Sequence, residues 1–283
     1  MGTGVYANAF GCEYVWRPGA SPAVHYRYHS LEEVAELPEP RIEDSPIMLR
    51  VLATIERFRE MTGDRLPIAP TDTQSANDSA TLILDACEVL AGAYTNPAVT
   101  HRLLAQVNRL IIDFTRRQIE AIGPAPLACP GHIMVSDPTW RGLSISDDNL
   151  AVVSPHVGRE FCLRYDQELA EAFGGVAIHS CGRWQHLMPD AARMRKLVQV
   201  DCSVHRDCDP NPNEPEVVRD AFAGSDVAVK VRGPNDIEAW LALLPQLAHR
   251  QLRLIVQLAM APDPVQAEAN YLRMDRALTA LYG

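Results

Sequence analysis

The stretch Gly174-Gly175-Val176-Ala177-Ile178-His179-Ser180-Cys181-Gly182-Arg183 carries the clearest structural signal in this sequence. Its short apolar run is typical of a strand that is buried in a parallel sheet. His179 and Cys181 lie two residues apart, so on an extended chain their side chains point to the same face. An imidazole and a thiol at a strand end can bind a soft metal such as zinc. The alternative is a packed cysteine beside a hydrogen-bonded histidine, because a metal site needs three or four ligands.

The composition narrows the class of protein. The chain has 283 residues, and its net charge of −10 argues against nucleic acid or an anionic membrane as a partner. It contains no apolar run long enough to span a bilayer, and its N-terminus lacks the features of a signal peptide. The seven cysteines are irregularly spaced and do not indicate a disulfide framework. We therefore expect a cytoplasmic protein with no membrane partner.

The chain is expected to divide near residue 64. Residues 1–46 are rich in aromatic residues and prolines, and a capping-box pattern at Ser30 predicts one short helix there. Helical spacing of apolar residues predicts a second helix over 48–61, which stops at Gly63. We assign residues 1–63 to an irregular N-terminal segment with a helix, and residues 64–283 to an α/β domain. Its first expected elements are a strand over 66–69, a helix over 82–90, and a long helix between Asn96 and Gly123.

From about residue 140 the sequence alternates strands and helices. Strands are predicted at 143–146, 176–178, 197–200, 227–231 and 254–258, with a helical pattern after each. This alternation is typical of a parallel sheet with covering helices. The carboxyl ends of such strands carry the site in α/β barrels and in open sheets alike. A glycine-rich nucleotide-binding turn is missing, which argues against a nucleotide-binding sheet.

Polar residues follow several of these strands. Asp147 and Asp148 are adjacent, so at most one should face a pocket, as a general acid/base or as a partner that orients a metal ligand. The other would cap a helix or form an ion pair. Arg232 and Arg183 could bind a carboxylate or phosphate of the substrate; an internal ion pair for Arg232 and solvent exposure for Arg183 are the alternatives. His132 is expected to be structural.

The order of these motifs resembles the uroporphyrinogen decarboxylase superfamily. The resemblance runs from about residue 64 to the end and is most specific over 143–183. The superfamily contains the decarboxylases and zinc-dependent methyltransferases that move methyl groups between corrinoids and thiols. The resemblance implies a (β/α)8 barrel with its site at the C-terminal face, and this barrel is either complete or lacks its first strand. The matching motifs are Ile145-Ser146-Asp147-Asp148, Ser154-Pro155, Glu160-Phe161 and Ile178-His179-Ser180-Cys181-Gly182.

The resemblance also implies a zinc site, for which His179 and Cys181 supply two ligands. Cys202 is the expected third ligand, because it ends the next strand and neighbouring strands lie about 4.8 Å apart. It could instead be a half-buried residue at a strand end. His205 and Cys208, in the following loop, are weaker candidates and more simply interpreted as ordinary loop residues.

Two departures from the family pattern bear on function. The arginine-rich first strand that decarboxylases use has no counterpart, and the last strand, Val256-Gln257-Leu258-Ala259-Met260, carries neither the Cys nor the His found there in the family. The favoured function is methyl transfer to a small thiol from a corrinoid, a corrinoid protein or a small methyl donor. The alternatives are a decarboxylase of tetrapyrrole metabolism and a non-catalytic tetrapyrrole- or corrinoid-binding protein. A missing strand would leave exposed sheet edges, so a homodimer is expected.

Overall fold

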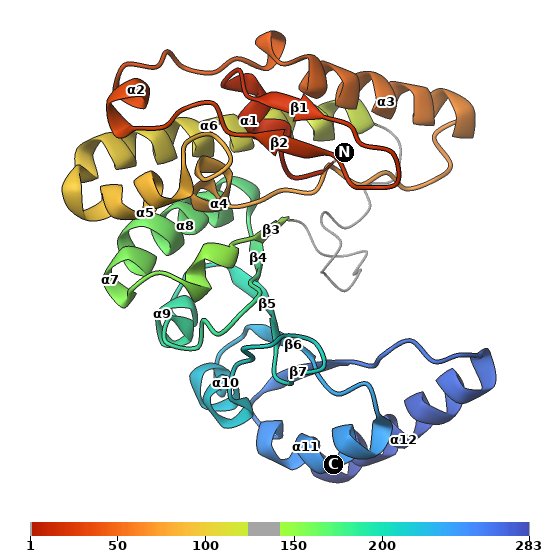
Figure 1. The fold of residues 1–283 in the computed structure, drawn as a ribbon. Helices are drawn as coiled ribbons and strands as arrows, with labels where there is room; N and C mark the ends of the chain where they lie inside the picture. Colours follow the sequence, from red (N-terminus) through yellow and green to blue (C-terminus); the bar gives the residue numbers. More distant parts are fainter. Residues whose placement is uncertain (1, 124–141, 283) are drawn as a thin grey trace.

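The computed structural model describes residues 2–123 and 142–282 of the chain. Its main element is a sheet of five parallel strands, each beside the next one along the chain (Figure 1). The five strands predicted after residue 140 are confirmed, and the third continues past its predicted end to Ser203. They are β3 (Leu143–Ser146), β4 (Val176–His179), β5 (Leu197–Ser203), β6 (Ala228–Arg232) and β7 (Arg253–Gln257).

The pairing of β4 with β5 contains a bulge. Val176 lies beside Leu197, but Ala177 lies beside Gln199, so one residue of β5 is skipped. His179 consequently lies beside Asp201. Because side chains alternate along a strand, an extra residue changes which members of β5 share a face with β4. We call the face that carries His179 and Asp201 the inner face of the sheet.

Helices cover the outer face of the sheet. Ile178, Val200 and Cys202 point to this side and belong to the hydrophobic core. A continuous helical segment follows β3, and its last part, α8, packs against β3 and β4. None of the described helices is long and apolar enough to cross a membrane. The helical elements after β3 are η2 (Asp148–Ala151), α7 (Pro155–Val157), the π-helical η3 (Gly158–Leu163), α8 (Arg164–Phe173), α9 (Met188–Ala191), α10 (Pro215–Phe222), α11 (Ile237–Leu247) and α12 (Pro264–Tyr282).

The N-terminal part of the chain is mainly helical and lies beyond β3 (Figure 1). Its helices pack on the long helix α6, which begins at the predicted cap Asn96. Residues such as Tyr6 are fully buried in the same core as the sheet. The segment is therefore more ordered than expected. Its elements are α1 (Val5–Ala9), β1 (Glu13–Val15), β2 (Ala23–His25), α2 (Leu31–Ala35), η1 (Ile42–Asp44), α3 (Pro46–Thr62), α4 (Ala76–Ala80), α5 (Ala86–Thr95) and α6 (Pro97–Ile122).

The described residues do not form a closed barrel. The strand expected over 66–69 is reduced to a single bridge at Ile68, and the helix expected over 82–90 begins only at Ala86. Between described residues, two isolated parallel bridges involve residues 2–123, namely Gln74 with Ser146 and Tyr28 with Leu84, and Ile68 also lies in a single bridge. Within the described ranges the sheet is thus an open run of five parallel strands.

Candidate metal centre

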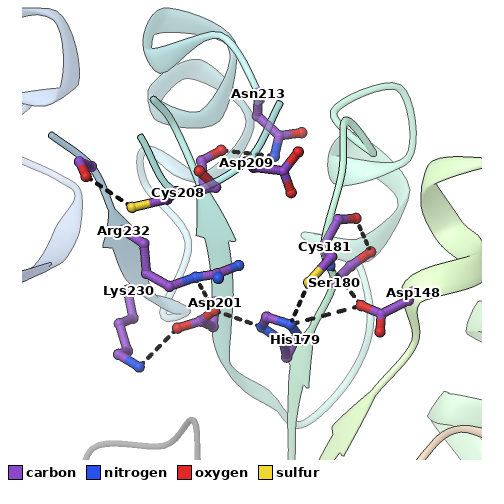
Figure 2. Close-up of polar contacts among 12 residues, drawn as sticks. Asp148, His179, Ser180, Cys181, Asp201, Cys208, Asp209, Asn213, Lys230 and Arg232 are labelled. Atoms are coloured by element: carbon purple, nitrogen blue, oxygen red, sulfur yellow. Dashed lines mark hydrogen bonds and ion pairs between the residues drawn. The ribbon is translucent and has the colours of Figure 1, made fainter. Parts of the chain in front are cut away.

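Three side chains that can bind a metal meet at the carboxyl end of β4 (Figure 2). They are Asp148, His179 and Cys181, and one ligand atom from each lies within 4.8 Å of the other two. His179 Nε2 is 3.2 Å from Cys181 Sγ and 3.7 Å from Asp148 Oδ1. The group brings together nitrogen, sulfur and oxygen donors at the strand ends where an α/β enzyme carries its site.

His179 is held from behind by Asp201. Its Nδ1 lies 2.7 Å from Asp201 Oδ1, and both side chains are buried. Lys230 Nζ lies 2.9 Å from the other carboxylate oxygen, and Arg232 Nε lies 3.1 Å from Oδ1. A histidine that binds metal commonly donates its second ring N–H to a carboxylate, which fixes the orientation of the ring. The contact leaves Nε2 facing Cys181 and Asp148.

Hydrogen bonds hold the backbone of Asp148 in place, and the side chain of Asp148 in turn holds the backbone of Cys181. The buried carboxylate of Asp78 accepts hydrogen bonds from the N–H groups of Asp148 at 2.8 Å and Asn149 at 3.0 Å, so it caps η2. Asp148 Oδ1 in turn accepts the N–H of Cys181 at 2.7 Å. The carboxylate of Asp148 therefore touches the backbone of one candidate ligand and faces the imidazole of the other.

The loop that follows β5 holds the turn after Cys181 in place through hydrogen bonds (Figure 2). Gly182 has a φ of +70°, a conformation that favours glycine, and its N–H donates to Asp209 Oδ2 at 2.7 Å. The Asn213 side chain donates to the carbonyls of Gly182 and Ser203 and accepts the N–H of Trp184. These contacts hold the thiol of Cys181 in place relative to β5.

The surroundings shift the pKa of the Cys181 thiol and that of Asp201 in opposite directions. Burial raises the pKa of the Cys181 thiol, the negative charge of Asp148 raises it further, and the guanidinium of Arg232 opposes both. Burial would also raise the pKa of Asp201, but hydrogen bonds from His179 and Lys230 and their charges lower it below its ordinary value. Asp201 is therefore an ionised carboxylate, whereas the free Cys181 thiol resists losing its proton.

The donor set fits a zinc ion. In tetrahedral zinc sites, bond lengths of about 2.0–2.3 Å place ligand atoms about 3.4–3.6 Å apart. The measured separations of 3.2 Å and 3.7 Å lie close to that range. Three protein ligands leave one position open, as in catalytic zinc sites. The fit rests on the chemistry of the three donors and on the Asp201 contact that directs Nε2 toward them.

The structure differs from the sequence prediction at Cys202. Its side chain is fully buried in the hydrophobic core on the outer face, and Asp148 takes the third place in the group. The bulge in the pairing of β4 with β5 is the reason. Without it, His179 would lie beside Val200, and Val200 and Cys202 would share its face; with it, Asp201 does so. Burial also raises the pKa of the Cys202 thiol.

The other candidate residues are placed as follows. Arg232 joins the group through Asp201, whereas Arg183 contacts the carbonyl of Pro212 at 3.0 Å and the carboxylate of Glu214 at 3.2 Å, away from the three ligands. Cys208 contacts the carbonyl of Gly233, and His205 lies beside Asp207. His132 and Cys129 lie outside the described residues.

Asp147 points away from its neighbour Asp148, as expected for adjacent residues, but it does not cap a helix or face the site. It is fully buried and forms a pair with Asp166 of α8. Burial raises the pKa of Asp147 well above its ordinary value, and the negative charge of Asp166 adds to the effect. Burial likewise raises the pKa of Asp166 to about 8, against a hydrogen bond from Asp147 that lowers it. The pair therefore holds protons at neutral pH.

Sequence reasoning missed Asp201 as a site residue, along with the residues that hold the two turns in place. Asp201 was visible as a polar residue at a strand end, which was the available signal. Asp78 lies 70 residues from Asp148 in the sequence, and Asn213 lies 31 residues from Gly182, so no local pattern connects them.

Comparison with known proteins identifies a family and a similar fold. The family model "Uroporphyrinogen decarboxylase (URO-D)" matches residues 3–218. The match begins earlier than the sequence resemblance indicated and ends within α10. No curated protein matches the chain significantly. Among solved structures, a methyltransferase from Methanosarcina mazei is similar with a TM-score of 0.64 and 17% identity, over 100% of this chain and 79% of that one. At this identity the likeness concerns the fold.

Proposed function

The chain belongs to the uroporphyrinogen decarboxylase family, and we propose that it is a zinc-dependent methyltransferase that moves a methyl group between a corrinoid or small methyl donor and a thiol. The observation that carries the proposal is the convergence of Asp148, His179 and Cys181. This set contains a thiol and an imidazole, which suit zinc, and leaves room for a fourth ligand. The similarity in fold to a methyltransferase is consistent with the proposal.

Each residue of the group has a role in this proposal. His179, Cys181 and Asp148 would hold the zinc ion. When bound, zinc would supply the positive charge that keeps a substrate thiol deprotonated and therefore nucleophilic. Asp201 orients His179, and Asp148 holds the backbone of Cys181.

Arg232 is suited to contact the substrate. Its Nη2 is buried and has no hydrogen-bond partner among residues 2–123 and 142–282, while Nε forms an ion pair with Asp201. The charge of this guanidinium also acts on the Cys181 thiol. A buried N–H donor of this guanidinium that is left over beside the candidate metal group would favour a substrate or carrier with an anionic group, since an unsatisfied buried donor is costly.

The alternative of a tetrapyrrole decarboxylase has less support. Such a substrate carries several carboxylates and needs several free cations. On the inner face, Lys230 and Arg232 both pair with Asp201, and Arg253 donates to the carbonyl of Asp226. A non-catalytic member that binds a tetrapyrrole or corrinoid is the remaining alternative. It would not require the three-donor group.

The test compares metal content and methyl transfer in matched variants. Purified wild-type protein should contain or take up one zinc ion and transfer methyl groups from methylcobalamin to small thiols, followed by the loss of the methyl–cobalt absorbance. Cys181→Ser should lose both properties. Cys87→Ser, which replaces an exposed cysteine of α5 that is not one of the three donors, should keep both. Protein that binds no zinc, or that binds a corrinoid tightly without methylating any thiol, would contradict the proposal.

A further inference from the structure

One buried carboxylate, that of Asp201, contacts three charged or metal-binding side chains from the two neighbouring strands. Asp201 of β5 is only 1% exposed. It contacts His179 from the strand on one side, and Lys230 and Arg232 from the strand on the other (Figure 2). The contact lengths are 2.7 Å to His179, 2.9 Å to Lys230 and 3.1 Å to Arg232.

The position of these partners explains why the carboxylate tolerates burial. A buried charge is unfavourable unless it is paired and hydrogen-bonded. Two cations on one side and an imidazole on the other supply that pairing, and the parallel register sets Asp201 beside His179 and Lys230. Removing one partner of a buried ion pair usually destabilises the protein, because it leaves a buried charge unpaired. We therefore expect Asp201 to keep these contacts in the folded protein.

The consequence for His179 concerns its tautomer. A carboxylate can only accept a hydrogen bond, so the proton of a neutral imidazole in this contact must sit on Nδ1. The lone pair on Nε2 then points toward Cys181 Sγ at 3.2 Å and Asp148 Oδ1 at 3.7 Å. In the other tautomer Nε2 would carry a proton and could not bind a metal, and Nδ1 would face the carboxylate without a proton between them.

We infer that Asp201 is a positioning residue of the metal centre, which selects the Nδ1–H tautomer of His179 while Lys230 and Arg232 hold its carboxylate in place. The inference rests on the proposed zinc site. The sequence predicted that Cys202 of β5 would bind the metal beside His179. In the structure the residue of β5 that faces His179 is Asp201, which orients a ligand instead of binding the metal.

The first measurement reads the tautomer directly in metal-free protein. With 15N-labelled histidine at about pH 8, where an imidazole is ordinarily neutral, His179 should carry its proton on Nδ1. Its signals are identified by their loss in His179→Gln. The double variant Asp201→Leu/Lys230→Met removes the acceptor together with one buried cation, and His179 should then lose its preference for Nδ1–H. Lys230→Met alone leaves Asp201 and Arg232 in contact with each other and should keep the wild-type tautomer.

The second measurement is zinc affinity by competition with a chelator. The double variant should bind zinc about 10–100-fold more weakly than Lys230→Met, as is usual when the partner of a metal-bound histidine is lost. A wild-type His179 protonated on Nε2, a tautomer unchanged in the double variant, or equal zinc affinities would overturn the inference.

Wild-type protein without zinc affinity would instead refute the proposed function, and the tautomer spectrum would still decide the role of Asp201. If the double variant does not fold, Asp201→Asn with the same two measurements replaces it, and a wild-type tautomer and affinity there would also overturn the inference.

Discussion

Replacing Asp166 with asparagine should make the protein more stable, and more so as the pH rises. Asp166 is fully buried on α8 beside Asp147, and burial raises its pKa from 3.8 to about 8. Asparagine has nearly the same shape and no charge. Asp166→Asn therefore removes the cost of ionising this group while its contacts stay in place.

The direction of the pH dependence follows from proton binding. Because the pKa is raised in the folded state, folded protein keeps a proton between about pH 4 and pH 8 that unfolded protein releases. Wild-type stability should then fall as the pH rises through this window, by up to about 1.4 kcal/mol per pH unit for one proton. A rise in pKa of about four units corresponds to about 5 kcal/mol in total. Between pH 5 and pH 8, the gain from Asp166→Asn should increase by about 4 kcal/mol.

Urea unfolding followed by circular dichroism at pH 5, 6, 7 and 8 measures this difference. The matched control is Asp275→Asn, which makes the same replacement at an exposed position of α12 and should follow the wild-type pH dependence. Equal slopes for wild type and Asp166→Asn, or a loss of stability at pH 8, would refute the reasoning. The first result would mean that the buried pair holds no extra proton. The second would mean that the charge of Asp166 is itself stabilising.

Three further predictions concern the metal centre and assembly. Cys202→Ala should keep wild-type zinc content, because Cys202 lies in the core and not in the donor group; loss of zinc, measured by atomic absorption, would return it to the site. Zinc binding at pH 7 should release about one proton, because the pKa of the Cys181 thiol is raised in the free protein, and calorimetry in buffers of different ionisation enthalpy counts the protons. Release of none would mean that this thiol is not a ligand. The chain of 31.3 kDa should sediment as a homodimer, since β7 pairs on only one side among the described residues; a strictly monomeric mass would exclude this.

The local patterns of the sequence predicted the repeated units of the fold. Apolar runs that end in polar residues marked β3 through β7, and helical spacing marked α3 and α6 with the Asn96 cap. These signals depend on residues that are close in sequence, so one chain is enough to read them. The closure of a barrel depends on pairing between distant segments. The segment 66–69 has a composition suited to a strand but is reduced to a single bridge at Ile68, because composition alone does not determine how far a strand pairs with a neighbour.

The metal centre was predictable in part for the same reason. His179 and Cys181 lie on one short segment, and strand alternation correctly placed them together. Asp148 comes from a different strand end, and its role could be narrowed only to one of two adjacent aspartates. Its position depends on Asp78, a residue of α4 that caps η2 from 70 residues away. Contacts of this kind become visible only when the chain is folded.

The bulge between β4 and β5 has the largest chemical consequence of the features that the sequence did not reveal. A one-residue change in register decides whether Cys202 or Asp201 faces His179. With Cys202 the group would contain two thiols, whereas the structure gives it one thiol and one carboxylate, Asp148. Both sets can carry two negative charges, so either could balance the charge of a zinc ion. The observed set has only one protein sulfur, and a thiol substrate at the open position would supply the second. In the proposed function, the second sulfur ligand would therefore come from the substrate and not from a further residue of the chain.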